Sequence, residues 1–350
     1  LKASEMEVEE TRQNLKLNVT LAYFQLLNAL DVLNLAKARA ELTQKQVERL
    51  EVLAKEGFGN PADYTDMKGQ LANDNMAAIN AENAIVQARI NLFQLLGMDT
   101  DENLLFERFG VDEALEAYPL SAEEIYTESL QNLAAYKVRE FRQEAAKSGV
   151  SVAKAGFTPE ISVFGQLNTS YSSIAQVFEA TGTETVETGD FVTVDGNTIN
   201  VQREQTIFEG NTLSYSDQFD NNLNTAYGVS VNIPLFNGFR AKNNVKLSKI
   251  QWQDAQIDFE NTKLQFKQAI EQSHENMIAA FRRYSVLQEQ VLAFEESFRI
   301  NEIRFNNGVS NIVEYITSKN NMDAAQLNLA NAKYEYALRV KVLDFYRGMN

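Results

Sequence analysis

The 350-residue chain contains no cysteine, which excludes a disulfide framework and a thiolate metal site. It has only 4 prolines and 16 glycines, too few for a disordered or collagen-like chain. Its abundant Ala, Glu, Lys, Leu, Asn and Gln residues instead favour long helices. The length would accommodate two or three compact domains, yet no obvious linker separates them.

Positive charge is also scarce: 32 Lys and Arg residues stand against 48 Asp and Glu, and the net charge is −16. Since phosphate contacts require clustered Lys and Arg, we do not expect the chain to bind nucleic acid. No uninterrupted run of 18 apolar residues occurs, so no transmembrane helix is predicted. The first five residues read as polar helix and carry no signal-peptide pattern.

The sequence also lacks the motifs that mark the common enzyme classes, and it has a single histidine. The single histidine, His274, lies within an amphipathic helical pattern, where a packing or surface role is typical. The zinc-protease, thiol-redox, serine-hydrolase, P-loop and dinucleotide-binding motifs are all absent. A helical enzyme would need a constellation that the sequence lacks, so we expect no catalytic residue, no cofactor and no metal site.

The stretch from Ala226 to Arg240 begins as a strand and ends as a helix. Small or polar residues alternate with a wholly apolar face, formed by Tyr227, Val229, Val231 and Ile233. This alternation is typical of a soluble sandwich strand, and equally of a membrane-barrel strand whose apolar face meets lipid. Pro234 ends the strand because it has no N–H to donate, and Asn237-Gly238 supplies a turn.

Five long helices are predicted from apolar residues that recur at three- and four-residue steps. They cover residues 1–56, 62–96, 121–155, 239–307 and 312–347. The first would be roughly 85 Å long, which exceeds the helices of a compact domain.

A second strand is predicted at residues 160–171, and residues 174–224 read as a long loop that joins the two strands. This loop is rich in Thr, Asn, Gly and acids, with Arg203 as its one basic residue. On a barrel the long loops face outward, and a solvated surface insertion would have the same composition.

The second half of the chain repeats the first at a constant offset of 251 residues, with no gap. Corresponding pairs include Gly57 and Gly308, Asn60 and Asn311, Asp63 and Glu314, Tyr64 and Tyr315, Lys68 and Lys319, and Leu92 and Leu343. Two helical hairpins with identical arm lengths indicate a duplication. The first repeat would then also have a strand and a corner before Leu1, so we expect that a signal sequence and a first β-hairpin are missing from this chain.

Two motifs resemble the TolC family of outer-membrane efflux proteins, the outer membrane factors. One is the corner IPLFNGFR at 233–240, and the other is the hairpin tip RFNNGVSNIVE at 304–314. The resemblance covers the chain apart from residues 174–224. It implies a mainly α fold with a membrane β-hairpin. Long α-helical hairpins would be duplicated in tandem, and three copies would form an α-helical tunnel and a β-barrel.

The resemblance divides the chain into five segments. They are a first helical hairpin at 1–97, an equatorial segment at 98–120, a helix leading to the barrel at 121–158, a barrel β-hairpin at 159–235 with an external loop at 174–224, and a second helical hairpin at 236–350. The strand-to-helix corner would consist of Pro234, Asn237 and Gly238.

Asp63 and Glu314 follow the two tip glycines at the same spacing. Their simplest role is that of helix-start acids, which the helix dipole favours. The resemblance implies instead that they line the periplasmic mouth, where a trimer would gather them into a cation-attracting constriction. The family's second ring acid, gating arginine and gating tyrosine correspond to Thr317, Ser310 and Phe305. The charged latch of the family is therefore altered here.

The resemblance further implies a homotrimer in the outer membrane of a Gram-negative-type bacterium, with its helices in the periplasm. It would export substrates passively from a periplasmic adaptor (a membrane fusion protein) and an inner-membrane pump, in a tripartite efflux or type I secretion system. The adaptor-contacting tip residues would be Gly57, Asn60, Gly308 and Asn311. The alternative is a soluble coiled-coil scaffold or adaptor protein without channel activity, which has no use for an outward apolar strand face.

Overall fold

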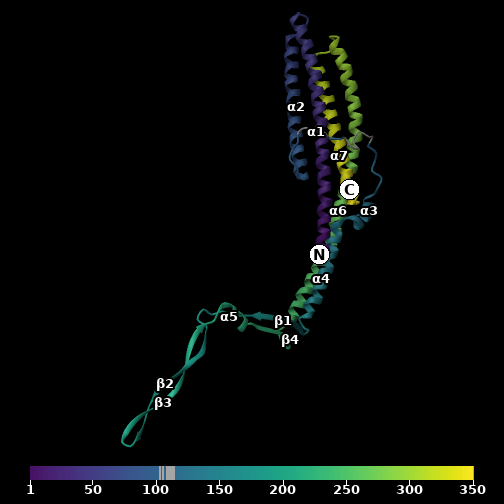
Figure 1. Ribbon diagram of the computed structural model, residues 1–350. Helices are drawn as coiled ribbons and strands as arrows, with labels where there is room; N and C mark the ends of the chain where they lie inside the picture. Colours follow the sequence, from purple (N-terminus) through teal and green to yellow (C-terminus); the bar gives the residue numbers. More distant parts are fainter. Residues whose placement is uncertain (102–103, 105, 108–114, 350) are drawn as a thin grey trace. The chain divides into compact units, whose positions relative to one another are not determined.

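A computed structural model describes residues 1–101, 104, 106–107 and 115–349. These residues form a helical unit, residues 1–150 and 246–350, and a β unit, residues 151–245. The elements in chain order are α1 (Lys2–Lys55), α2 (Pro61–Leu96), α3 (Ala122–Asn132), α4 (Ala134–Ala155), β1 (Glu160–Asn168), β2 (Gln176–Val194), β3 (Asn197–Thr212), α5 (Tyr215–Asn221), β4 (Asn224–Asn232), α6 (Arg240–Asn306) and α7 (Ile312–Tyr346) (Figure 1).

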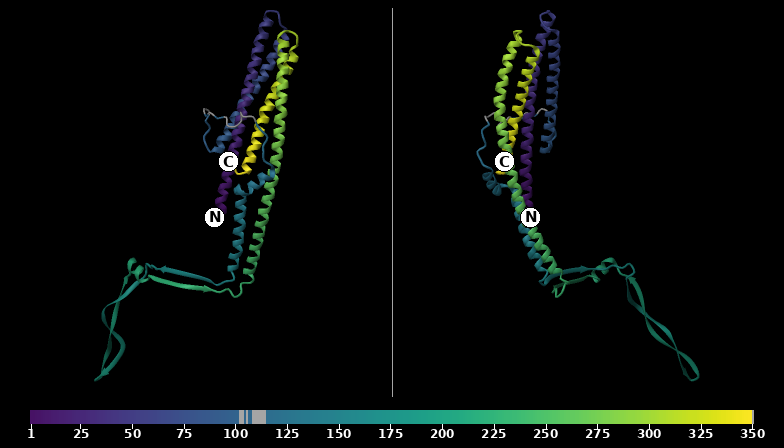
Figure 2. Two further views of the ribbon diagram at one scale, coloured as in Figure 1. Left: turned by 90° about the vertical axis from the view of Figure 1, so that its right-hand side faces the viewer. Right: turned by 180° about the vertical axis from the view of Figure 1, so that it is seen from behind.

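The helical unit is built from the hairpins α1–α2 and α6–α7, which lie side by side (Figure 2). Its core is divided into small apolar clusters along the helices. Near the tips, one cluster joins all four helices through Val47, Leu50, Met67, Phe298, Ile312 and Tyr315. The four helices begin and end within two residues of the positions that periodicity predicted.

The single helix predicted for residues 121–155 is wrong, because the chain breaks at Leu133 into α3 and α4. Leu133 is extended (φ −77°, ψ 127°) and buried. The side chain of Gln13 replaces the lost helix bonds: Nε2 donates to Asn132 O at 3.3 Å, and Oε1 accepts the N–H of Ala134 at 3.1 Å. Hydrogen bonds from Gln13 of α1 therefore stabilise this break, at which the sequence has neither proline nor glycine.

Helix α1 qualifies the expectation about membrane-spanning helices. It contains an 18-residue window of mean hydropathy 1.3, which passes a length-and-composition test for a membrane span. About a third of that window is buried inside the fold, at 33%. Packing against α2 and α7 accounts for residues such as Leu26 and Leu27, which have no exposed surface.

In the β unit, β1 pairs antiparallel with β4, in a register that sets Ile161 opposite Val231 and Val163 opposite Val229. The interior of the predicted loop at 174–224 is not a loop: β2 and β3 form a second antiparallel hairpin, and α5 follows it. Its turn is Asp195-Gly196, with φ of +52° and +88°. Positive φ at both positions is the mark of a tight hairpin turn, and the Asp-Gly pair favours it.

The short helix α5 joins the two strand pairs through Gln218, which is almost fully buried. Its Nε2 donates to Ser172 O and Leu213 O, both at 3.0 Å, and its Oε1 accepts the N–H of Ser172 at 2.7 Å. One side chain thus satisfies backbone groups of the two segments that connect the strand pairs, at Ser172 between β1 and β2 and at Leu213 after β3. The predicted equatorial segment 98–120 lies partly outside the described residues.

Candidate functional site

The first candidate site is the tip between α1 and α2. Leu53 O accepts hydrogen bonds from the N–H groups of Phe58 and Gly59, both at 2.9 Å. The turn places Gly57 at φ +77°, in the left-handed region that side chains disfavour. Asn60 then caps α2, because its side-chain oxygen accepts an N–H of the first turn at 3.0 Å.

The tip between α6 and α7 has the same backbone design. Arg304 O accepts two N–H groups of the turn, at 2.8 and 3.3 Å. Gly308 has φ +71°, and Asn311 caps α7 by accepting an N–H at 2.9 Å. The side chain of Arg304 also lies 3.8 Å from the carboxylate of Glu314. The carbonyl that accepts two N–H groups and the left-handed glycine are the same in both turns, whereas Asn60 caps the N–H of Ala62 and Asn311 caps that of Glu314, one residue farther along.

The two tip acids are held differently. Asp63 Oδ1 accepts a hydrogen bond from Asn60 Nδ2 at 3.2 Å. Glu314 accepts from Ser310 Oγ at 2.6 Å and from Asn311 Nδ2 at 3.2 Å. Both carboxylates thus stabilise the start of their own helix, as acids at a helix N-terminus do. Their further role in a constriction stays a prediction.

The heights of the two acids can be compared through polar contacts farther along the helices. Helices α2 and α7 both start at the tips and run in the same direction (Figure 1). Gln70 Nε2 donates to Asn320 Oδ1 at 3.0 Å, a pair separated by 250 residues. Asp63 and Glu314 are separated by 251. By this contact the two acids differ in height by about one residue, whereas the Asp74–Lys319 contact, between residues 245 apart, gives a difference of about six residues, or about 9 Å.

The remaining predicted mouth residues lie in different surroundings. Phe305 is half-buried, and its ring centroid lies 4.9 Å from that of Tyr315. Thr317 is exposed. Burial raises the pKa of the Tyr315 phenol, whose hydroxyl has no hydrogen-bond partner among the described residues. Ser310 is thus joined to Glu314, whereas Phe305 belongs to the apolar packing behind the tip.

A buried charged cluster just behind the tips was missed by sequence reasoning. Lys319 Nζ donates to Asp74 Oδ2 at 2.9 Å and to Asp323 Oδ2 at 2.7 Å. Arg39 Nε lies 2.9 Å from the same oxygen of Asp323, without the alignment of a hydrogen bond. Thr43 Oγ1 also donates to Asp74 Oδ2, at 2.6 Å. In the sequence, Lys319 stood out only as the repeat partner of Lys68.

The second candidate site is the apolar face of the β1–β4 sheet. This face carries six large apolar side chains that are each more than half exposed: Ile161, Val163, Leu167, Tyr227, Val229 and Val231. The opposite face carries small and polar residues, with Phe164 as the exception. The ring of Phe164 covers Gly228, where an added Cβ would lie 2.8 Å from it. Ile233, just beyond the strand, is exposed as well.

The strand-to-helix corner contains a strained residue that the sequence did not single out. Pro234 follows the end of β4, and Arg240 N–H donates to Asn237 O at 3.2 Å. Gly238 and Phe239 then have φ of +63° and +62°. A left-handed conformation is costly for an aromatic residue. The sharp corner from strand to helix therefore depends on two consecutive left-handed residues.

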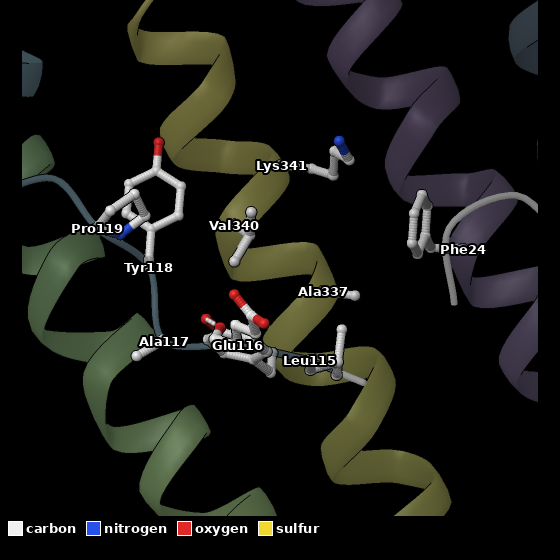
Figure 3. A pocket seen from close by; sticks show the side chains of 10 residues that line it. Phe24, Leu115, Glu116, Ala117, Tyr118, Pro119, Ala337, Val340 and Lys341 are labelled. Atoms are coloured by element: carbon white, nitrogen blue, oxygen red, sulfur yellow. Dashed lines mark hydrogen bonds between the residues drawn. The ribbon is translucent and has the colours of Figure 1, made fainter. Parts of the chain in front are cut away.

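A hollow of about 360 Å³ lies in the helical unit, where residues 115–119 cross α7 (Figure 3). Its lining is mainly apolar, with Glu116 and Lys341 as the charged members. His274 lies nearby, at 3.0 Å from Leu120 O, which accords with a packing role. Among the described residues, no group of three potential metal ligands comes together.

Comparisons with known proteins identify relatives for nearly the whole chain. A family model described as "Outer membrane efflux protein" matches residues 1–98 and 125–348. The outer membrane protein TolC of Vibrio cholerae is 22% identical over 94% of this chain. The Escherichia coli TolC is 24% identical over 93% of it. The chain spans 66% and 60% of the lengths of these two relatives.

Solved structures agree on the fold. The Campylobacter jejuni CmeC outer membrane channel matches with a TM-score of 0.71 at 17% identity, over 99% of this chain and 65% of that one. The predicted fold class, with tandem helical hairpins and barrel strands, is thereby confirmed.

Proposed function

Because the chain belongs to the outer membrane efflux protein family, we propose that it forms a passive export duct in the outer membrane. Substrates would pass from a periplasmic adaptor and an inner-membrane pump to the outside. The duct would carry out no reaction of its own, since the energy for transport comes from the pump. The cargo could be drugs, metals or proteins.

The observation that carries this proposal is the two-faced β1–β4 sheet. One face is apolar and exposed, and the other is small and polar apart from Phe164. Such a sheet suits a barrel wall with lipid outside and water inside. Two strands leave two unpaired edges, which lipid cannot satisfy. Even with the first β-hairpin that the repeat predicts, the two hairpins of one copy cannot close a barrel alone, and we propose a homotrimer.

The helical tips support a second part of the proposal. Gly57, Asn60, Gly308 and Asn311 form two matching turns, which would meet the adaptor. Asp63 and Glu314, each in the first turn after its tip, would form rings around the trimer axis. Like charges gathered in this way attract cations and oppose closure of the mouth.

A soluble coiled-coil scaffold is the competing function. It would use the same helical packing, but it offers no reason for an apolar sheet face that is mostly more than half exposed. The membrane duct accounts for both the helices and that face.

The test compares two neighbouring substitutions on opposite sheet faces, Val231→Arg and Asn232→Arg, in protein extracted from membranes. Arg at 231 should impair barrel assembly by about 2–4 kcal/mol if it lies near the bilayer midplane, while Arg at 232 should be tolerated better. Trimer yield after detergent extraction is the measurement. Equal losses for both variants, or a wild-type monomer that needs no detergent, would refute the duct.

A further inference from the structure

We propose that the buried cluster of Arg39, Asp74, Lys319 and Asp323 is a register lock. It sets the axial position of α2 against α7, and thereby fixes the axial offset between the two tip acids. The inference rests on the proposed function in one respect only, the use of those acids as a constriction.

The cluster joins three helices within the core. Its members come from α1, α2 and α7, and the side chains of Lys319 and Asp323 have no exposed surface. The Asp74 side chain is 3% exposed and the Arg39 side chain is 20% exposed. Two cations and two anions balance, so the cluster has no net charge with which to attract an ion. The cluster is therefore better suited to fixing the positions of the helices than to binding an ion.

Charge makes this contact sensitive to sliding in a way that the surrounding contacts are not. Apolar packing is non-directional, so residues such as Met67 and Ile312 would find new partners if α7 moved by one turn. Lys319 would not, because its ammonium group bridges carboxylates on two helices. A shift would leave a buried charge without its partner, which is strongly unfavourable.

Neighbouring polar groups strengthen the same register. Gln70 Nε2 donates both to Asp74 Oδ1 at 3.1 Å and to Asn320 Oδ1 at 3.0 Å. The amide of Gln70 thus connects the cluster directly to a second polar contact between α2 and α7. Asp323 Oδ1 is buried without a hydrogen-bond partner among the described residues, so the cluster carries the cost of one unsatisfied acceptor.

The duplication shows that the cluster is not simply inherited. Lys68 is the repeat partner of Lys319, but it is exposed and lies 5.8 Å from the ring of Tyr64. Ala72 stands where Asp323 would repeat, and Ala325 stands where Asp74 would repeat. The acids occur in only one copy each, at the place where the two hairpins meet. A contact that couples the two hairpins requires charged residues at this place and not at the equivalent place in the other copy.

The experiment uses disulfide formation to read the register, which the absence of native cysteine makes free of background. A first reporter carries Gln70→Cys and Asn320→Cys, and a second carries Gln70→Cys and Ala324→Cys, one turn farther along α7. Both are placed in the full chain in membranes. Each is then combined with a charge-free cluster, Arg39→Met, Asp74→Leu, Lys319→Met and Asp323→Leu.

With the native cluster, the first reporter should cross-link and the second should not. In the charge-free background the first reporter should slow by about ten-fold while the second gains. A shift of one turn, about 5.4 Å, carries the first pair beyond disulfide reach. The matched control is Lys68→Met, the exposed repeat partner, which should leave both reporters unchanged. A folded charge-free variant with native cross-linking would overturn the lock.

If the charge-free variant does not assemble, a charge swap decides. Lys319→Asp alone should lose the first cross-link, and adding Asp74→Lys should restore it; no restoration overturns the proposal. Cross-linking needs no channel activity, so a wild-type protein that fails to conduct would refute the duct and leave this test standing. Planar-bilayer recordings of the charge-free variant should in turn show altered cation selectivity, because the axial offset between the acids changes.

Discussion

The two helical tips share a backbone and differ in their side-chain chemistry. Each has a left-handed glycine, a carbonyl that accepts two N–H groups and an asparagine cap. Around the acid the tips diverge: Ser310 and Arg304 approach Glu314, where Gly59 and Leu53 occupy the corresponding places near Asp63. The turn depends on a few residues with special backbone geometry, and these recur in both repeats, whereas the side chains around the acid differ.

The same contrast extends into the core behind the tips. Tyr64 and Tyr315 are repeat partners, but Tyr315 is fully buried and Tyr64 only partly. Lys68 and Lys319 differ more, since one is on the surface and the other is enclosed by carboxylates. A duplicated sequence can thus place equivalent residues in opposite environments, because each repeat packs against different neighbours.

The largest expected difference between the repeats concerns these lysines. Lys319→Met leaves two buried carboxylates without their ammonium partner, and it should lower the free energy of unfolding by about 3–5 kcal/mol. Lys68→Met, at an exposed position, should change it by less than about 0.5 kcal/mol. Urea unfolding followed by helical circular dichroism measures both. Similar effects at the two positions would contradict the assigned burial.

The next effect should be equal in the two repeats. Gly57→Ala and Gly308→Ala each place a residue with a Cβ in the left-handed backbone conformation, which should lower the free energy of unfolding by about 1–2 kcal/mol. An added Cβ meets nothing within 4 Å at either position, so no packing term should separate them. Thermal unfolding of the two variants should give matching shifts. A clear difference would mean that the tips are not conformationally equivalent.

A smaller effect should follow from removing the helix caps. Asn60→Ala and Asn311→Ala each delete the acceptor for an N–H of the first turn, at about 1 kcal/mol. Hydrogen exchange in the first turns of α2 and α7 would localise the loss. Faster exchange confined to the mutated tip is the expected result, and faster exchange in both tips would mean that the caps act on a shared structure.

The smallest effect on stability should come from the acids themselves. Glu314→Gln and Asp63→Asn should each alter stability by about 0.3–1 kcal/mol, as helix-start acids do. Their combined effect on conduction should be larger: reduced cation selectivity and weaker block by divalent cations in planar bilayers. If selectivity and block stay unchanged, the carboxylates serve only their helices.

Some structural features could be read from local patterns. The long helices and their ends follow from three- and four-residue periodicity, and the tips from glycine and asparagine at fixed spacing. The apolar strand face follows from alternation. The β2–β3 hairpin was also readable, because Asp195-Gly196 is a strong hairpin-turn signal, but the acidic composition of the segment suggested a loop instead.

The sequence by itself determined the four helices of the two long hairpins, the duplication and the two-faced strand, because each of these depends on neighbours along the chain. Only the tertiary structure decided the break at Leu133, the strained Phe239 and the burial of Lys319. The break is satisfied by Gln13 from a distant helix, and the charge of Lys319 is balanced by acids on two helices. Such features depend on which helix faces meet. The spacing of residues along one helix does not determine the axial position of the helix that packs against it.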